Sequence, residues 1–246
     1  MKILLSAVAI FAFSTLAFAQ TVVITPKKTV YTRKGKIATK EKRTFTVTYP
    51  VVSGAISAPV KKKLENTISY WRVFETTLAE NLTESNWLSD LSYEVNYNKN
   101  GILDISLTQE GAGAYPDSQT YNLVIDLKTG NQVKFDDVFR SDQRAPFAAL
   151  VGKKLEVEKR QQMAEVDKEQ TDREANESIK ESLRGLEFTA ETFNEFTVGE
   201  KGVTILYDAG FPHAIQAVQP DGRYFFTWAE VRSFIKPNGL FGRFAK

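Results

Sequence analysis

Residues 101–139 constrain the fold of this chain more than any other part of the sequence. They contain two segments rich in β-branched and apolar residues, 102–109 and 120–127, and a Gly- and Pro-containing loop, 111–117, between them. A third alternating segment, residues 91–97, precedes them and is followed by an Asn-Gly pair, which supplies the positive φ of a hairpin turn. Alternation with period two is typical of half-buried strands. The pattern predicts a three-stranded antiparallel meander with one apolar and one polar face.

An amphipathic helix over residues 59–80 is expected to cover the apolar face of this meander. Ser57 can cap the helix, and Pro59 in the first turn loses no hydrogen bond. Apolar residues then follow at spacings of three and four, which predicts one buried stripe made of Val60, Leu64, Ile68, Trp71, Phe74 and Leu78. Upstream, residues 44–52 alternate like a half-buried strand, and Pro50 favours an edge or a strand end there.

A long helix follows the meander, because residues 146–160 carry apolar side chains at helical spacing. Residues 161–182 are strongly charged, which leaves two interpretations open: a solvent-facing helical extension or a mobile insertion. Ile179 and Leu183 indicate a return to the core.

Three short strands are then expected at residues 193–198, 203–208 and 224–226. Thr227 and Glu230 form a capping box that begins a short last helix. We therefore predict an α+β fold, in which an antiparallel β-meander covered by an amphipathic helix is followed by a long helix and a C-terminal β-β-β-α segment. No internal repeat or long linker is present, so residues 44–246 are predicted to form a single domain, with sub-parts 44–139 and 140–246.

The first residues have the pattern of a secretory signal peptide. Lys2 precedes an apolar run, residues 3–18, and the small-x-small ending predicts cleavage after Ala19. A transmembrane anchor is the alternative, but the run is short for a span of about 20 residues. No later stretch could cross a bilayer, so we expect no membrane span after residues 1–19 are removed.

Residues 20–43 form a basic N-terminal leader, rich in Thr and Lys. It is either a mobile segment or an edge hairpin with a turn at Lys34 and Gly35. Its charge run is more typical of a solvated face than of a binding site. The mature chain has 31 basic and 30 acidic residues, a net charge of +1, which argues against a nucleic-acid partner.

The chain contains no cysteine and one histidine, His213. A secreted chain without disulfides has to be stabilised by its core, and about 227 residues suffice for that. These features indicate a bacterial envelope protein, periplasmic or extracellular. Thiol catalysis is excluded, and a zinc site of several histidines cannot form. No Gly-x-Ser-x-Gly or His-Glu-x-x-His motif is present, so we assign no catalytic residue, no metal site and no cofactor.

Paired carboxylates are the enzymatic chemistry that composition leaves open, since a glycosidase needs two of them. Those in and beside the meander are Glu110, Asp117, Asp126, Asp136 and Asp137. Asp136 and Asp137 follow a strand without a catalytic motif, and a capping role is the favoured interpretation.

Two loops with Gly, Pro and aromatic residues are the candidate ligand-binding regions, residues 111–117 and 210–214. Aromatic side chains on loops bury a large area at low entropic cost. The predicted ligand-binding residues are Tyr115, Pro116, Asp117, Phe211 and His213. His213 is interpreted as part of a structural or surface loop and not as a catalytic base.

A succession of motifs resembles a known family. Tyr49, Pro50, Val52 and Gly54 precede the amphipathic helix; Tyr-Asn-Leu-Val-Ile-Asp-Leu-Lys-Thr-Gly occupies 121–130, Phe-Asp-Asp-Val-Phe occupies 135–139, and Lys-Gly-Val-Thr-Ile-Leu-Tyr-Asp occupies 201–208. Over residues 44–236 the chain resembles the bacterial domain family of unknown function found at the C-termini of the anti-sigma factor RsiV and the peptidoglycan deacetylase PdaC.

That resemblance implies an isolated envelope-facing domain that binds cell-wall material, such as peptidoglycan, or a secreted protein such as lysozyme. The family's loop typically reads Gly-Gly-Ala-His-Pro, whereas here Tyr115 holds the His position, which argues against metal or proton chemistry at that place. The leading hypothesis is a non-catalytic binding domain. The alternatives are a carboxylate-dependent cell-wall hydrolase and an accessory or scaffold protein that meets its partner through residues 161–182.

Overall fold

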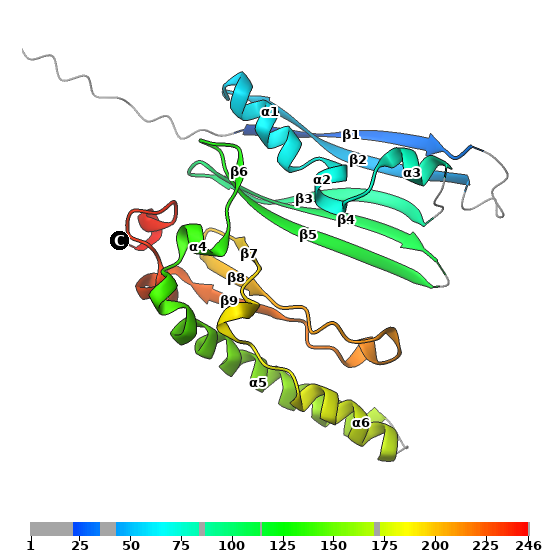
Figure 1. Ribbon diagram of the computed structural model, residues 1–246, viewed down its shortest axis with the longest axis vertical. Helices are drawn as coiled ribbons and strands as arrows, with labels where there is room; N and C mark the ends of the chain where they lie inside the picture. The colour runs from blue at the N-terminus through cyan, green and yellow to red at the C-terminus, as the bar shows by residue number, and fades with distance from the viewer. Residues whose placement is uncertain (1–21, 35–42, 84–86, 114, 170–172, 246) are drawn as a thin grey trace, which may run out of the picture.

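The chain folds into two sheets with helices, as the computed structural model shows for residues 22–34, 43–83, 87–113, 115–169 and 173–245. A six-stranded mixed sheet is followed by a long helix and a three-stranded sheet, and a short helix follows the last strand (Figure 1). The predicted α+β fold class is confirmed. The helices in the described ranges are all too short or too polar to span a membrane. The predicted signal peptide, residues 1–19, lies outside the described residues.

The predicted meander forms the centre of the larger sheet. Strands β3 (Leu88–Lys99), β4 (Ile102–Ala112) and β5 (Pro116–Asp126) pair antiparallel in sequence order. The β3–β4 turn has φ values of 57° at Asn100 and 73° at Gly101, as the Asn-Gly pair predicts. The two-residue strand β6 (Asn131–Gln132) pairs only with the last two residues of β5.

The basic leader forms an edge strand of this sheet. Strand β1 (Val22–Thr32) pairs along its whole length with β2 (Thr44–Gly54), and β2 joins the meander through a short parallel pairing with β3. The mobile-segment interpretation is therefore wrong for residues 22–32, while the predicted turn at Gly35 lies outside the described residues. Arg33 also departs from the expected solvated face: it is 5% exposed, and its Nε donates to the Asn81 carbonyl at 3.0 Å.

Three short helices replace the single helix predicted over residues 59–80. They are α1 (Ala58–Thr67), α2 (Tyr70–Phe74) and α3 (Leu78–Thr83). Ser69 is extended (ψ 144°) and Glu75 is left-handed (φ 54°), and each residue ends the helical run. The breaks turn Trp71 outward, where it is 53% exposed. Leu64, Ile68, Phe74 and Leu78 pack in the core on the sheet as expected, whereas Val60 is partly buried outside that core.

The second unit begins with the helix α4 (Phe135–Val138) and the long helix α5 (Arg144–Glu169). Helix α6 (Arg173–Arg184) follows, and its Ile179 and Leu183 pack with Val166 of α5, so the charged segment is helical and not a mobile insertion over the described part. The 3₁₀ turns of this unit are Ser141–Gln143, Ala190–Thr192, His213–Val218, Arg232–Phe234 and Gly242–Ala245.

The three predicted C-terminal strands are present as an antiparallel sheet that lies on α5 (Figure 1). They are β7 (Glu195–Val198), β8 (Gly202–Leu206) and β9 (Arg223–Thr227). The predicted capping box begins α7 (Trp228–Val231): the Thr227 N–H donates to Glu230 at 2.7 Å, and the Glu230 N–H donates to the Thr227 hydroxyl at 3.3 Å.

Each unit has its own apolar core. One core lies between the larger sheet and helices α1–α3, and the other lies around α5 and the smaller sheet. Tyr97, Ile102 and Val124 project from the opposite face of the larger sheet into the second core. The second unit therefore packs against the end of that face where the side chains of the meander are apolar.

A buried carboxylate also joins the two sheets. Asp104 of β4 is 0% exposed; it accepts hydrogen bonds from the Asn96 amide at 2.9 Å and from the Val198 N–H of β7. Burial raises the pKa of Asp104 to about 6, although these two donors and Arg223 oppose the shift. The orientation of β7 on the larger sheet thus depends on a single acidic side chain as well as on apolar packing.

Candidate ligand-binding cleft

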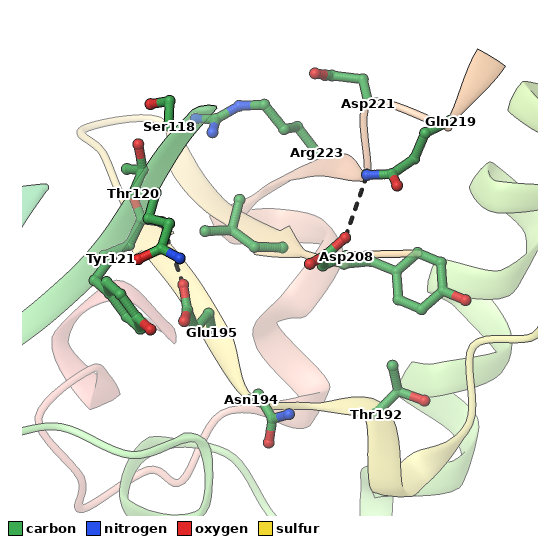
Figure 2. Close-up of a pocket in the computed structure, with 15 residues that line it drawn as sticks. Ser118, Thr120, Tyr121, Thr192, Asn194, Glu195, Asp208, Gln219, Asp221 and Arg223 are labelled. Atoms are coloured by element: carbon green, nitrogen blue, oxygen red, sulfur yellow. Dashed lines mark hydrogen bonds between the residues drawn. The ribbon is translucent and has the colours of Figure 1, made fainter. Parts of the chain in front are cut away.

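The face of the larger sheet that packs against the second unit also has a polar part, which borders a cleft between the two units. The cleft has a volume of about 630 Å³. One wall is β5, from Ser118 to Asn122, and the other is formed by the ends of β8 and β9 and the turn between residues 219 and 222 (Figure 2). Asn194 and Glu195, at the start of β7, connect the two walls. The cleft therefore exists because the second unit covers only part of the larger sheet.

The β5 wall is held by a ladder of side-chain hydrogen bonds across the sheet. Ser106 of β4 donates to the Asn122 Oδ1 at 2.8 Å, and the Asn122 Nδ2 donates to Glu195 at 3.3 Å. Thr108 and Thr120 share a hydrogen bond of 2.9 Å in the next row. These contacts fix the polar side chains of β5 and attach the strand to the start of β7.

The opposite wall depends on a tight turn at Gly222. Its φ is +67°, and a Cβ there would lie 1.9 Å from the Tyr207 carbonyl oxygen, so only glycine fits. Glu158 of α5 supports the same turn, since its carboxylate accepts the Asp221 N–H at 2.5 Å and the Tyr224 hydroxyl at 2.9 Å. The pKa of the Tyr224 hydroxyl is raised above its usual value, mainly because the group is buried and further because it lies against the Glu158 carboxylate.

The loop between β8 and β9 is closed by Gln219. Its Nε2 donates to the Asp208 carboxylate at 3.2 Å, and its Oε1 accepts the Phe211 N–H at 2.8 Å. Asp208 also accepts the Gly210 N–H at 2.8 Å. The loop is thereby held as a defined wall of the cleft, with Asp208 and Gln219 facing each other (Figure 2).

Carboxylates outnumber cations along the cleft. Glu195, Asp208 and Asp221 line it together with Arg223. No ion pair joins any of these four side chains to another residue in the described ranges. The cleft therefore carries a local excess of negative charge, which favours cationic groups in a ligand.

The two predicted binding loops contact each other beside the cleft, and none of the five predicted binding residues lines it. The rings of Tyr115 and His213 stack with their centroids 5.0 Å apart and an angle of 28° between their planes. Tyr115 is 66% exposed and His213 is exposed as well, so the stacked pair presents an open aromatic surface. Pro116 and Asp117 are exposed beside it at the start of β5, and the Asp117 carboxylate accepts the Ser118 N–H at 2.8 Å.

Phe211, predicted as an exposed contact residue, has a structural position. It is partly buried against the small cluster of Val166, Ile179 and Leu183 between α5 and α6. The sequence around Phe211 does not indicate that its ring packs against α5 and α6. Phe211 therefore anchors the 208–219 loop and does not extend the aromatic surface.

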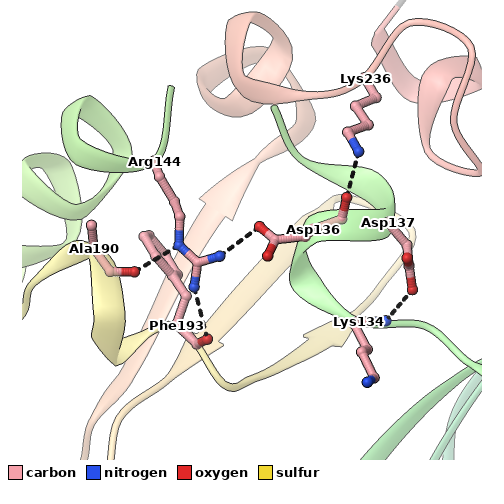
Figure 3. A network of polar contacts seen from close by, with 7 residues as sticks. All are labelled: Lys134, Asp136, Asp137, Arg144, Ala190, Phe193 and Lys236. Atoms are coloured by element: carbon pink, nitrogen blue, oxygen red, sulfur yellow. Dashed lines mark hydrogen bonds and ion pairs between the residues drawn. The ribbon is translucent and has the colours of Figure 1, made fainter. Parts of the chain in front are cut away.

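The five acidic residues that the sequence offered for a hydrolase do not line the cleft. Asp136 pairs with Arg144 at 2.5 Å, and Arg144 also donates to the carbonyls of Ala190 and Phe193 (Figure 3). Asp137 accepts the Lys134 N–H at 2.8 Å at the start of α4, which is the expected capping role.

Asp126 has a similar local role at the end of β5. Its carboxylate accepts the Lys128 N–H at 2.9 Å and the Thr129 hydroxyl at 3.0 Å in the following turn. Among the described residues, no three His, Cys, Asp or Glu side chains form a group that could hold a metal ion.

Sequence reasoning did not find Glu195, Asp208 or Arg223. Glu195 and Arg223 belong to no motif, Asp208 only ends the strand motif at 201–208, and the cleft that they line is formed by segments far apart in the chain. The available signal was the continuous polar stretch 118–122, which marks a solvent-facing wall but not its partner.

The comparisons with known proteins identify the fold. No protein-family model and no curated protein matches the sequence. Solved structures of similar fold include two of the DUF3298 family. A DUF3298 family member from Bacteroides fragilis has a TM-score of 0.55 and 14% identity, with 92% of this chain and 97% of that chain covered.

A DUF3298 family protein from Pseudomonas aeruginosa has a TM-score of 0.52 and 13% identity, with 88% of this chain and 94% of that chain covered. At these identities the likeness concerns the fold alone. The structural neighbours of this chain are thus bacterial proteins of a domain family of unknown function, and nearly the whole of each takes part in the match.

Proposed function

We propose that this protein is a non-catalytic binding domain of the bacterial envelope, periplasmic or extracellular, whose ligand occupies the cleft between β5 and the second unit. The ligand class follows from the resemblance to the RsiV and PdaC domains: cell-wall material or a secreted protein such as lysozyme. The signal-peptide pattern of residues 1–19 supports the location.

The observation that carries the proposal is the contact of Tyr115 with His213. It joins the two predicted contact loops, each of which continues into residues that line the cleft, Ser118 after the first loop and Asp208 and Gln219 on either side of the second. Ligand sites are usually preformed clefts of about 300–1,000 Å³, and this cleft has a volume in that range. Exposed stacked rings beside it offer a contact surface for a sugar ring or an aliphatic side chain.

The hydrolase alternative would have to use the carboxylates that line the cleft and not the five considered from the sequence. Asp126, Asp136 and Asp137 cap or pair locally, and none of the five carboxylates considered from the sequence lines the cleft. In the scaffold alternative, a partner could contact only the charged side of α6, because the other side of this helix packs on α5.

Retention on immobilised bait tests the proposal. The mature chain is passed over purified peptidoglycan and over immobilised lysozyme, and compared with Tyr115→Ala. We expect the wild-type chain to be retained on one bait, and Tyr115→Ala to bind about tenfold more weakly, which is the usual effect of truncating an aromatic anchor.

Trp71→Ala is the matched control, since Trp71 is an exposed aromatic residue of α2, on the other face of the larger sheet. It should bind like the wild type. Absence of wild-type retention on both baits, or equal losses for the two variants, would refute the proposal. Release of soluble fragments from peptidoglycan would favour the hydrolase instead.

A further inference from the structure

A free strand edge borders the candidate cleft. Strand β6 pairs with β5 only at Ile125 and Asp126, and no other strand in the described residues pairs with the outer side of β5. The segment from Ser118 to Asn122 therefore has β4 on one side and the cleft on the other. Unpaired strand edges are templates for a further strand.

The direction of the backbone groups on this edge can be worked out from one hydrogen bond. The Val133 N–H donates to the Val124 carbonyl at 2.7 Å, so the main-chain groups of Val124 point away from β4. In an antiparallel pair this direction alternates, and those of Asn122, Thr120 and Ser118 therefore point away from β4 as well. The Ser118 N–H agrees with this, since it donates to the Asp117 carboxylate and not to β4.

The lining of the cleft shows that it wraps around this edge. Side chains of successive residues lie on opposite faces of a sheet. Nevertheless, consecutive residues line the cleft, including Gln119 and Tyr121 on one face and Thr120 and Asn122 on the other. Tyr121 contacts Phe74 of α2 edge to face, whereas Asn122 bonds Glu195 of β7, which confirms the opposite directions. A cleft that touches both faces of one strand has the strand's backbone edge as its border.

We infer that the occupant of the cleft is an extended polypeptide segment with basic side chains, which pairs with the outer edge of β5 through Ser118, Thr120 and Asn122. This inference rests on the proposed function, because it names the ligand of the same site. Strand addition gives affinity through main-chain hydrogen bonds, and pockets beside the edge give specificity.

The charge of the cleft and the length of the free edge of β5 indicate the composition and the length of such a segment. Glu195, Asp208 and Asp221 lie along the same cleft against Arg223, so lysine or arginine side chains are favoured over acidic ones. Five residues of β5 span about 17 Å at a strand's rise, enough for two or three pairs of main-chain hydrogen bonds. The stacked rings of Tyr115 and His213 would contact one end of the segment.

A synthetic peptide tests the inference. An acetylated and amidated peptide of about nine residues that alternates threonine and lysine is titrated into the mature chain, and binding is followed by fluorescence anisotropy. A threonine–glutamate peptide is the charge control. We expect the glutamate peptide to bind at least about tenfold more weakly, with the difference shrinking at high salt.

Backbone pairing is tested by methylating the peptide itself. One version is N-methylated on every lysine and a second on every threonine, so that only one of them loses the N–H groups that face β5. We expect one methylated peptide to bind like the parent and the other at least about tenfold more weakly. Equal affinities of the two methylated peptides would overturn the strand pairing.

The protein side is tested with Glu195→Gln and Asp208→Asn, which remove charge but keep hydrogen-bond acceptors. Glu181→Gln, on the exposed side of α6, is the control. The cleft variants should bind the lysine peptide several-fold more weakly than the wild type, at an unchanged melting temperature. An affinity equal to that of the wild type would overturn the charge argument. If the chain is retained on peptidoglycan or lysozyme through Tyr115 while the lysine peptide does not bind, this inference is wrong and the proposed function stands; if the chain binds neither bait nor the peptide, both are wrong.

Discussion

Replacing Asp104 by asparagine changes a carboxylate that is fully buried between the two sheets. In the folded chain its pKa is raised from 3.8 to about 6, mainly by burial. The amide of asparagine has nearly the same shape and keeps an oxygen to accept the Val198 N–H. The Asn96 amide, which donates to Asp104, can turn to present its oxygen to the new amide group.

The size of the effect follows from linkage. Each pKa unit corresponds to about 1.4 kcal/mol, so a shift of about two units is worth about 3 kcal/mol. The folded pKa lies above the unfolded value, and protonation therefore favours the folded state. This stabilisation is fully present below about pH 4 and is lost as the pH rises through about 6. Above that, the buried negative charge of Asp104 lowers the free energy of unfolding.

The assay is urea unfolding of the wild type and Asp104→Asn at about pH 4 and about pH 8. We expect the variant to gain about 3 kcal/mol relative to the wild type between the lower and the higher pH, which is about 6–12 °C in melting temperature for a chain of this size. Other titrating groups cancel in this difference. A difference between the two proteins that is the same at both pH values would refute the reasoning, because it would mean that Asp104 titrates alike in the folded and unfolded chains.

Four further substitutions, with Gly210→Ala as a comparison for Gly222→Ala, test the supports of the cleft and the second unit by denaturant unfolding. Gly222→Ala should cost about 2 kcal/mol or more, because its Cβ would overlap the carbonyl of Tyr207, whereas Gly210→Ala (φ +64°, with open space around it) should cost only about 1 kcal/mol; similar losses would contradict the steric argument. Lys159→Met should cost about 2–4 kcal/mol, since the buried ammonium donates to two carbonyls at and just after the end of α6, and a loss below about 0.5 kcal/mol would count against that role. Thr227→Ala should cost about 1 kcal/mol by removing the cap of α7, and an unchanged unfolding midpoint would show that the cap is unimportant.

Local patterns in the sequence predicted the strands well. Alternation defined the meander, the Asn-Gly pair defined its turn, and Thr227 with Glu230 defined the last helix, because each signal depends on neighbours in the chain. The breaks at Ser69 and Glu75 were missed because the apolar spacing continues across them. Only packing against the sheet shows that Trp71 is left outside.

The candidate site was partly predictable for the same reason. Tyr115 and His213 could each be selected as loop residues, but their contact depends on how one unit sits on the other. The cleft carboxylate Glu195 belongs to no motif, Asp208 only ends the strand motif at 201–208, and Phe211 could not be distinguished from a surface aromatic without α6. Contacts of this kind are set by tertiary packing, to which sequence periodicity is blind.

Three apolar side chains of the larger sheet belong to the second core. This arrangement implies an order of folding. The described members of the first core all lie between residues 22 and 127, so that unit can complete its interior from one continuous stretch. The second core includes Tyr97, Ile102 and Val124, which are in place only when the meander has formed. A chain that emerges from its N-terminus therefore builds the surface on which its later half closes, and the cleft comes into existence as the last step of assembly.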